Sequence, residues 1–109
     1  MDNYILDGHT PVKTDNLQEW AEKFDRENRI VKQETIDRGH GLEPVKVSTV
    51  FLGLDHSFGS GPPILFETMV FGGHLDERQW RCSTWEQAEI QHQDACLLVL
   101  MATPEDKNE

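Results

Sequence analysis

Basic side chains are scarce in this chain. Its 109 residues include 20 Asp and Glu but only 10 Lys and Arg, which gives a formal net charge of −10. The deficit is largest in residues 55–109, which hold ten acidic and three basic side chains. Because binding to a phosphate backbone depends on cationic side chains, this balance argues against direct contact with nucleic acid. It favours either a basic protein partner, such as one that normally binds nucleic acid, or a role of the charge in solubility alone.

Cysteines and long apolar runs are also few. Only Cys82 and Cys96 occur, with no Cys-x-x-Cys pair and no signal-peptide pattern ahead of them. We therefore expect reduced thiols in a cytoplasmic protein, with Cys96 as a small core residue. The longest apolar run, residues 95–102, is less than half of the roughly 18 residues that a membrane-spanning helix needs. We expect no contact with a membrane.

The usual catalytic and metal-binding patterns are missing as well. No His-Glu-x-x-His, Cys-x-x-Cys or His-x-His sequence occurs. The segment Gly59–Pro63 lacks the Lys-Ser or Lys-Thr of a phosphate-binding loop, and its two prolines remove backbone donors. We therefore expect no catalytic residue, no metal and no cofactor, and a protein that is not an enzyme.

Four residues form one weak candidate pocket that would conflict with the expectation of a protein without enzymatic activity. Asp55 and His56 follow a predicted strand, Glu67 interrupts the next one, and His74 comes after it. Asp55 can orient His56 as a general base, or these two residues and His74 can hold a metal ion. In the competing interpretation, Asp55 caps a turn, His56 is partly exposed, and Glu67 faces water or pairs with an arginine.

The strongest structural signal is a pair of apolar segments. Residues 45–54 and 64–71 are rich in β-branched and aromatic side chains, and glycine and proline punctuate residues 55–63 between them. This pattern predicts two neighbouring strands of an antiparallel sheet. We expect Phe58 to tuck beneath the connecting turn.

The first part of the chain predicts a hairpin and an edge strand. Asp7-Gly8 lies between two short apolar segments, residues 4–6 and 11–12, and suits the positive φ of a hairpin turn. Residues 30–36 predict a strand whose polar side chains place it at a sheet edge. A turn cluster at residues 39–44 follows.

Two capping boxes predict two helices. The segment Asp15–Gln18 opens the first helix, which should end near Asn28. The segment Ser83–Glu86 opens the second helix, which should run to about Val99. Between the last strand and this helix, we expect residues 74–81 to form a charged loop.

The second predicted helix has two apolar faces. Its core-facing stripe covers roughly a third of the circumference and consists of Trp85, Ala88, His92, Ala95, Cys96 and Val99. A second cluster on a different face consists of Ile90, Leu97 and Met101. The helix is therefore either covered on both sides, or it changes to a strand at residues 97–100.

Together these elements predict one α+β domain, an antiparallel sheet of four to five strands with two helices packed on one face. The domain spans residues 1–103, and residues 104–109 form a polar C-terminal tail. We expect six large side chains from the helices and the sheet to share one core: Trp20, Phe24, Phe51, Phe66, Met69 and Trp85.

Five motifs support a family resemblance. They are Tyr-x-Leu-Asp-Gly-x-x-Pro-Val at residues 4–12, Leu-x-Glu-Trp at 17–20, Val-Ser-Thr-Val-Phe-Leu-Gly-Leu-Asp-His at 47–56, Gly-Pro-Pro-Ile-Leu-Phe-Glu-Thr-Met-Val-Phe-Gly-Gly at 61–73, and Ser-Thr-Trp-Glu at 83–86. With these motifs the chain resembles a family of small, uncharacterised bacteriophage and prophage proteins over most of residues 3–95. The resemblance implies a phage origin and expression in a bacterial cytoplasm, and it supplies no catalytic residue or ligand.

Three function classes follow from these observations. Small size, acidic charge and the lack of a catalytic pattern favour a protein that binds a host or phage protein. The resemblance suggests inhibition of a host defence complex of the CRISPR or restriction type. The alternative is a structural or housekeeping phage protein that forms homo-oligomers, which the second apolar face supports. The third is a small hydrolase or metal-dependent enzyme that uses Asp55, His56 and Glu67.

Two sets of residues are candidates for the partner-binding surface. We expect one negative surface, which would fit a basic groove on a nucleic-acid-binding protein, from Asp76, Glu77, Glu86, Glu89 and Asp94. The second set is the apolar cluster of Ile90, Leu97 and Met101.

Overall fold

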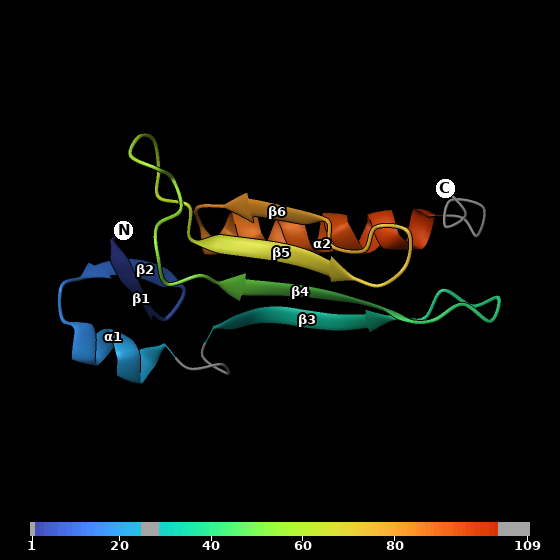
Figure 1. The fold of residues 1–109 in the computed structure, drawn as a ribbon, viewed down its shortest axis with the longest axis horizontal. Helices are drawn as coiled ribbons and strands as arrows, with labels where there is room; N and C mark the ends of the chain where they lie inside the picture. The colour runs from blue at the N-terminus through green and yellow to red at the C-terminus, as the bar shows by residue number, and fades with distance from the viewer. Residues whose placement is uncertain (1, 25–28, 103–109) are drawn as a thin grey trace.

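The computed structural model describes residues 2–24 and 29–102, and it has an α+β fold, as predicted (Figure 1). The predicted tail at residues 104–109 lies outside the described residues. In chain order the elements are β1 (Asn3–Asp7), β2 (Thr10–Thr14), α1 (Leu17–Lys23), β3 (Ile30–Ile36), β4 (Val45–Phe51), β5 (Phe66–Phe71), β6 (Gln79–Cys82) and α2 (Trp85–Met101).

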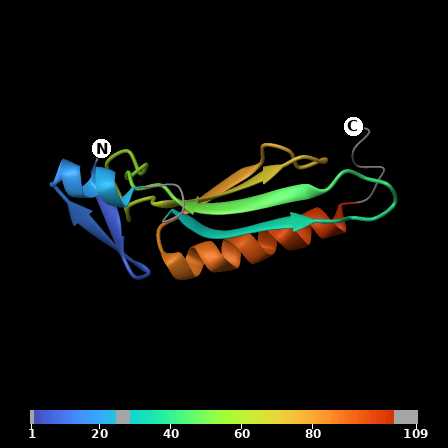
Figure 2. The same ribbon diagram turned by 90° about the horizontal axis from the view of Figure 1, so that it is seen from below.

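A four-stranded antiparallel sheet forms the centre of the molecule. Its strand order is β3-β4-β5-β6, so β3 lies at an edge, as predicted. The two apolar segments pair as expected, with Val47 opposite Val70 and Phe51 opposite Phe66. α2 packs along one face of this sheet (Figure 2).

The prediction of a loop over residues 74–81 is wrong at its end, because Gln79–Cys82 forms β6. This strand pairs with β5 and alternates between the two faces of the sheet. Trp80 packs against the core beneath α2, whereas the Arg81 Nε atom lies 2.9 Å from Glu67 Oε2 on the other face. Of the charged residues that suggested a loop, only Arg81 lies in β6, whereas Asp76, Glu77 and Arg78 precede the strand.

The expected hairpin forms from β1 and β2, and α1 packs against β1 at one end of the molecule (Figure 1). The prediction of two helices on one face is therefore corrected for α1. Gly53 anchors this end, since its carbonyl oxygen accepts hydrogen bonds from Tyr4 N (2.8 Å) and Trp20 Nε1 (3.0 Å). The N-cap of α1 is Asn16, one residue after the predicted Asp15. The helix ends at Lys23, and the predicted end near Asn28 lies outside the described residues.

The core consists of two clusters beneath α2 rather than one. Phe51, Leu65, Phe66 and Ala88 form the cluster near the hairpin, and Trp85 packs against it. The second cluster, towards the end of α2, comprises Ile36, Val45, Val47, Val70, Ala95 and Val99.

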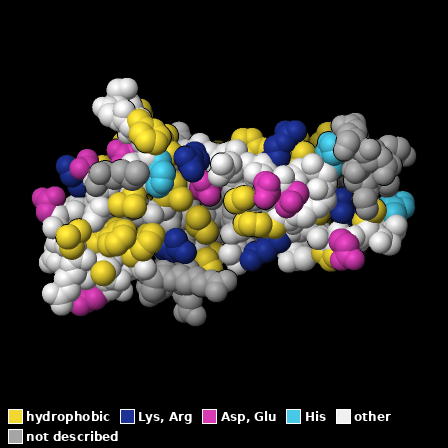
Figure 3. All heavy atoms as spheres, viewed as in Figure 1, with side chains coloured by type: hydrophobic (Ala, Val, Ile, Leu, Met, Phe, Trp, Pro, Cys, Tyr) yellow, Lys and Arg dark blue, Asp and Glu magenta, His cyan; other side chains and the backbone are white. Residues whose placement is uncertain are grey.

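Three residues of the predicted core lie elsewhere. Trp20 and Phe24 are partly buried and stack on each other with ring centroids 4.6 Å apart. Met69 alternates with the buried Thr68 and Val70, so it points to the open face of the sheet. Figure 3 shows that face, where hydrophobic side chains gather over the hairpin and α1, and acidic and basic side chains are interspersed over the strands.

α2 remains helical from Trp85 to Met101, so the alternative of a strand at residues 97–100 is excluded. Its N-cap is Thr84, one residue after the predicted Ser83, and a capping box joins Thr84 to Gln87. The predicted core stripe is confirmed, because Ala88, His92, Ala95 and Val99 are buried, with Trp85 and Cys96 packed beside them.

Candidate functional site

The side of α2 that points away from the sheet carries large apolar side chains among its polar ones. We call its five exposed large hydrophobic side chains the apolar face of α2: Ile90, Leu97, Leu98, Leu100 and Met101. Ile90 is 62% exposed and Met101 is 74% exposed. In this structure the sheet covers only one side of α2, so the apolar face lacks a covering element among the described residues.

Acidic side chains accompany the apolar face on α2 itself, and the basic residues beside it, Lys32 and Arg81, come from β3 and β6. α2 carries Glu86, Glu89 and Asp94, and no Lys or Arg lies between Trp85 and Met101. All three acidic residues are exposed. The face therefore combines apolar contact area with a negative rim.

The structure does not bring the five predicted acidic residues onto one surface. Asp76 and Glu77 lie in the loop between β5 and β6, where the Asp76 carboxylate accepts a hydrogen bond from Gly72 N at 2.6 Å. β6 then returns the chain along the sheet, so Glu86 lies at the opposite end (Figure 1). The negative surface of α2 is therefore limited to Glu86, Glu89 and Asp94.

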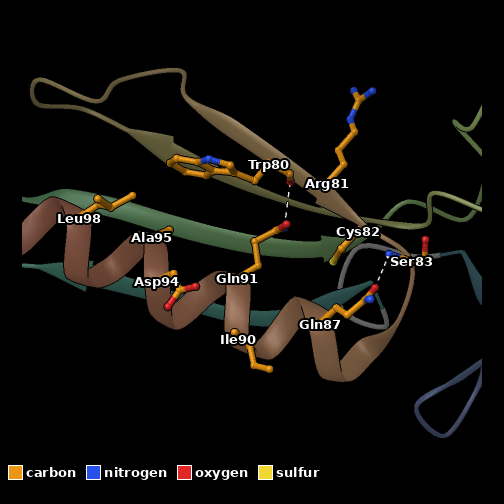
Figure 4. Close-up of a pocket in the computed structure, with 10 residues that line it drawn as sticks. All are labelled: Trp80, Arg81, Cys82, Ser83, Gln87, Ile90, Gln91, Asp94, Ala95 and Leu98. Carbon is orange, nitrogen blue, oxygen red and sulfur yellow. Dashed lines mark hydrogen bonds between the residues drawn. The ribbon is translucent and has the colours of Figure 1, made fainter.

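A groove of about 620 Å³ lies between β6 and α2 and continues the apolar face towards the sheet edge (Figure 4). Ile90 and Leu98 line it from α2, and Trp80 lines it from β6. Gln91 connects α2 to the sheet beside this groove. Its Nε2 donates hydrogen bonds to the Trp80 carbonyl oxygen (3.0 Å) and to Thr68 Oγ1 (3.1 Å).

The residues of the weak pocket are spread over the sheet rather than assembled. The Asp55 carboxylate accepts hydrogen bonds from Ser57 N and Ile64 N, so it caps the loop as the competing interpretation predicted. The hydrogen bond from Ser57 lowers the pKa of Asp55. The ring of the partly buried His56 donates from Nδ1 to the carbonyl oxygen of Leu54 at 2.8 Å.

Glu67 and His74 lie apart from that loop. Glu67 pairs with Arg81 on the open face of the sheet. His74 follows the far end of β5 and lines a small cavity with Arg38 and Leu75. The hydrolase arrangement that would use Asp55, His56 and Glu67 is therefore not assembled in this structure.

Phe58 does not tuck beneath its turn as expected. Its side chain is 87% exposed in the loop between β4 and β5, and its backbone has a φ of 56°. Because positive φ is uncommon for a residue other than glycine, this loop conformation is specifically held. The Asp55 hydrogen bonds account for part of that constraint.

A buried polar chain links the sheet to α2. His92 is 1% exposed, and its Nδ1 lies 2.7 Å from Thr49 Oγ1, which in turn lies 2.6 Å from Thr68 Oγ1. On the other side of the ring, His92 Nε2 lies 3.0 Å from Glu34 Oε1.

In this series of hydrogen bonds, donors and acceptors follow one direction from Gln91 to Glu34. The Glu34 carboxylate can only accept, so His92 Nε2 carries the hydrogen. Burial lowers the pKa of His92, so the ring is neutral and its Nδ1 accepts from the Thr49 hydroxyl. Thr68 then donates to Thr49 and accepts from Gln91. The hydrogen bond with His92 lowers the pKa of Glu34, which keeps the carboxylate ionised.

Cys96 extends this chain to a three-residue cluster that the sequence did not predict. Its Sγ lies 3.9 Å from Glu34 Oε1, and burial raises the pKa of the Cys96 thiol. Glu34, His92 and Cys96 have ligand atoms within 4.8 Å of one another, and no other three His, Cys, Asp or Glu side chains do so among residues 2–24 and 29–102. The one available signal was that His92 and Cys96 share the core stripe, one helical turn apart.

Comparison with known proteins adds no guide to function. No family model, no curated protein and no solved structure matches this chain. Within the described residues, no helix combines the length and the apolar character that a membrane span requires.

Proposed function

We propose that this protein acts by binding another protein through the apolar face of α2. The observation that supports this proposal is the exposure of Ile90, Leu97, Leu98, Leu100 and Met101 on a single helix. Large exposed apolar patches rimmed by polar residues are typical of protein interaction sites. The groove beside β6 offers a pocket in which an anchoring side chain of the partner would be buried.

The charge around the face indicates the chemistry of the partner. Glu86, Glu89 and Asp94 favour an apolar surface with a basic rim, because complementary potentials promote encounter. Pairing of two copies through this face would instead bring two sets of these carboxylates together without a basic side chain from either helix. A different protein is therefore the better occupant than a second copy.

A partner that normally binds nucleic acid carries such a basic surface. The resemblance to small phage proteins favours a host protein in a bacterial cytoplasm, and we propose inhibition of a defence complex of the CRISPR or restriction type. In this proposal the protein does not act as an enzyme, and it reaches neither nucleic acid nor membrane directly.

Affinity capture from host cells with matched variants tests the proposal. The double variant Ile90→Gln, Leu97→Gln removes apolar contact area and keeps good helix formers. Leu17→Gln is the control, since Leu17 is 68% exposed but lies on α1. The proposal predicts that the wild type and the control recover the same protein and that the double variant loses it.

Equal recovery by the double variant would contradict the proposed surface. Recovery of only further copies of this chain, lost in the double variant, would replace the proposal with self-association. Circular dichroism of each variant shows whether a loss of binding reflects unfolding instead.

A further inference from the structure

We propose that Glu34, His92 and Cys96 form a binding site for a divalent metal ion of the zinc class. The site adjoins the proposed partner surface, because Glu89 and Leu97 line the same pocket as the three ligands. It would use one carboxylate oxygen, one imidazole nitrogen and one thiolate sulfur, which are the three ligand types that zinc takes from proteins. A thiolate in the set favours zinc over magnesium or calcium, which prefer oxygen ligands.

Two elements, α2 and β3, bring the three ligands together. His92 and Cys96 are four residues apart on α2, so they lie one above the other on the same side of the helix. Glu34 reaches them from β3, the neighbouring edge strand.

Two of the three distances between ligand atoms can be compared with those of a tetrahedral zinc site. Tetrahedral zinc with bond lengths of about 2.0 Å to nitrogen and oxygen and about 2.3 Å to sulfur separates N from O by ~3.3 Å and S from O by ~3.5 Å. Here the N···O distance between His92 and Glu34 is 3.0 Å, and the S···O distance between Cys96 and Glu34 is 3.9 Å. Both distances are within about 0.4 Å of the tetrahedral values, and all three ligand atoms lie within 4.8 Å of one another.

Thr49 supplies the outer-shell partner that a metal-binding histidine needs. When a metal ion takes His92 Nε2, the ring hydrogen moves to Nδ1 and is donated to Thr49 Oγ1, which lies 2.7 Å away. The hydroxyl of Thr49 then donates to Thr68 Oγ1. The Cys96 thiol loses its proton to solvent on binding.

A solvent-facing pocket leaves room for a fourth ligand. It has a volume of about 430 Å³ and is lined by Lys32, Glu89 and the three proposed ligands, among others. The Lys32 ammonium lies 3.4 Å from Glu34 Oε1, but its side chain is largely exposed and can turn into solvent. A water molecule or Glu89 would complete the coordination.

Cobalt titration of the untagged, metal-free full chain tests the site, with a reductant that contains no thiol. The wild type should show a thiolate-to-cobalt absorption band that saturates at one equivalent and disappears when zinc is added. Cys96→Ser should abolish the band, whereas Cys82→Ser should keep it, because Cys82 lies on β6 away from the cluster. Glu34→Gln should weaken cobalt binding at least by the roughly tenfold that loss of an outer-shell partner costs.

Three results would overturn the site. They are the absence of a thiolate band in the wild type, an unchanged band in Cys96→Ser, or its loss in Cys82→Ser. Circular dichroism confirms that the two serine variants remain folded, so the spectra report on ligation.

Discussion

Thr49 is fully buried between two polar side chains, and its hydroxyl links them. It donates to His92 Nδ1 and accepts from Thr68. Thr49→Val keeps the shape and leaves both neighbours without this partner, so we expect a loss of about 1–3 kcal/mol in the free energy of unfolding. Denaturant melts measure the loss, and Thr35→Val, at an exposed position of β3, is the control. Equal stability of the two variants would contradict the proposed hydrogen-bonding role of Thr49.

The thiol of Cys82 leads to a second prediction for a single residue, which concerns the pH dependence of its alkylation. Burial raises the pKa of its thiol to about 11. Because only the thiolate is alkylated, the reactive fraction at pH 8 should be about a thousandth, against about a quarter for a free cysteine of pKa ~8.5. In a Cys96→Ser background, the rate of alkylation by iodoacetamide should keep rising about tenfold per pH unit from 7 to 9. A rise that slows to well below tenfold per pH unit between pH 8 and 9 would show an ordinary thiol, which is half ionised near pH ~8.5.

Single residues also show the limit of the sequence patterns. Asp15 with Gln18 and Asn16 with Glu19 both fit the capping box, and so do Ser83 with Glu86 and Thr84 with Gln87. The helices use the second pair in each case, because tertiary packing sets the register that the local pattern leaves open. The contact of Glu34 with His92 spans 58 residues, and no local spacing could predict it.

Among the secondary-structure elements, the unit of β1, β2 and α1 depends on Gly53. Gly53 has a φ of 74°, and an added Cβ would overlap the ring of Phe24. We therefore expect Gly53→Ala to detach this unit, with faster hydrogen exchange at residues 3–23 and unchanged protection of the four-stranded sheet. Gly41→Ala is the matched control, since its φ is 71° and nothing lies near an added Cβ. Unchanged exchange at residues 3–23 in Gly53→Ala would refute the anchoring role.

The elements with a clear hydrophobic periodicity were predictable from the sequence. The short and partly polar strand β6 was not. β4, β5 and α2 have strong apolar patterns, and the structure confirms their type and pairing. β6 has four residues, two of them polar, next to the charged loop residues Asp76–Arg78. Its strand conformation comes from pairing with β5 and from Trp80 packing under α2, both of which are non-local.

For the whole molecule, the acidic rim predicts an effect of salt on partner binding. The variant Glu86→Lys, Glu89→Lys, Asp94→Lys should slow association and flatten its salt dependence, because these charges act over a Debye length of about 8 Å. Its stability should fall by less than about 1 kcal/mol, mainly through Glu86 in the first turn of α2.

The control for this variant reverses three exposed acidic residues away from α2: Asp15, Glu22 and Glu43. Surface plasmon resonance at several salt concentrations would compare the two triple variants. If both change association equally, only the net charge matters, and the rim of α2 has no specific role.

The most direct test of the partner surface is photo-cross-linking in host cells. A photoreactive amino acid would replace Leu97 on the apolar face of α2 in one protein and Leu17 on α1 in another, as both positions are at least half exposed. The account predicts that position 97 forms a covalent adduct with one host protein and that position 17 does not. Equal adducts at both positions, or adducts at position 97 only with further copies of this chain, would contradict it.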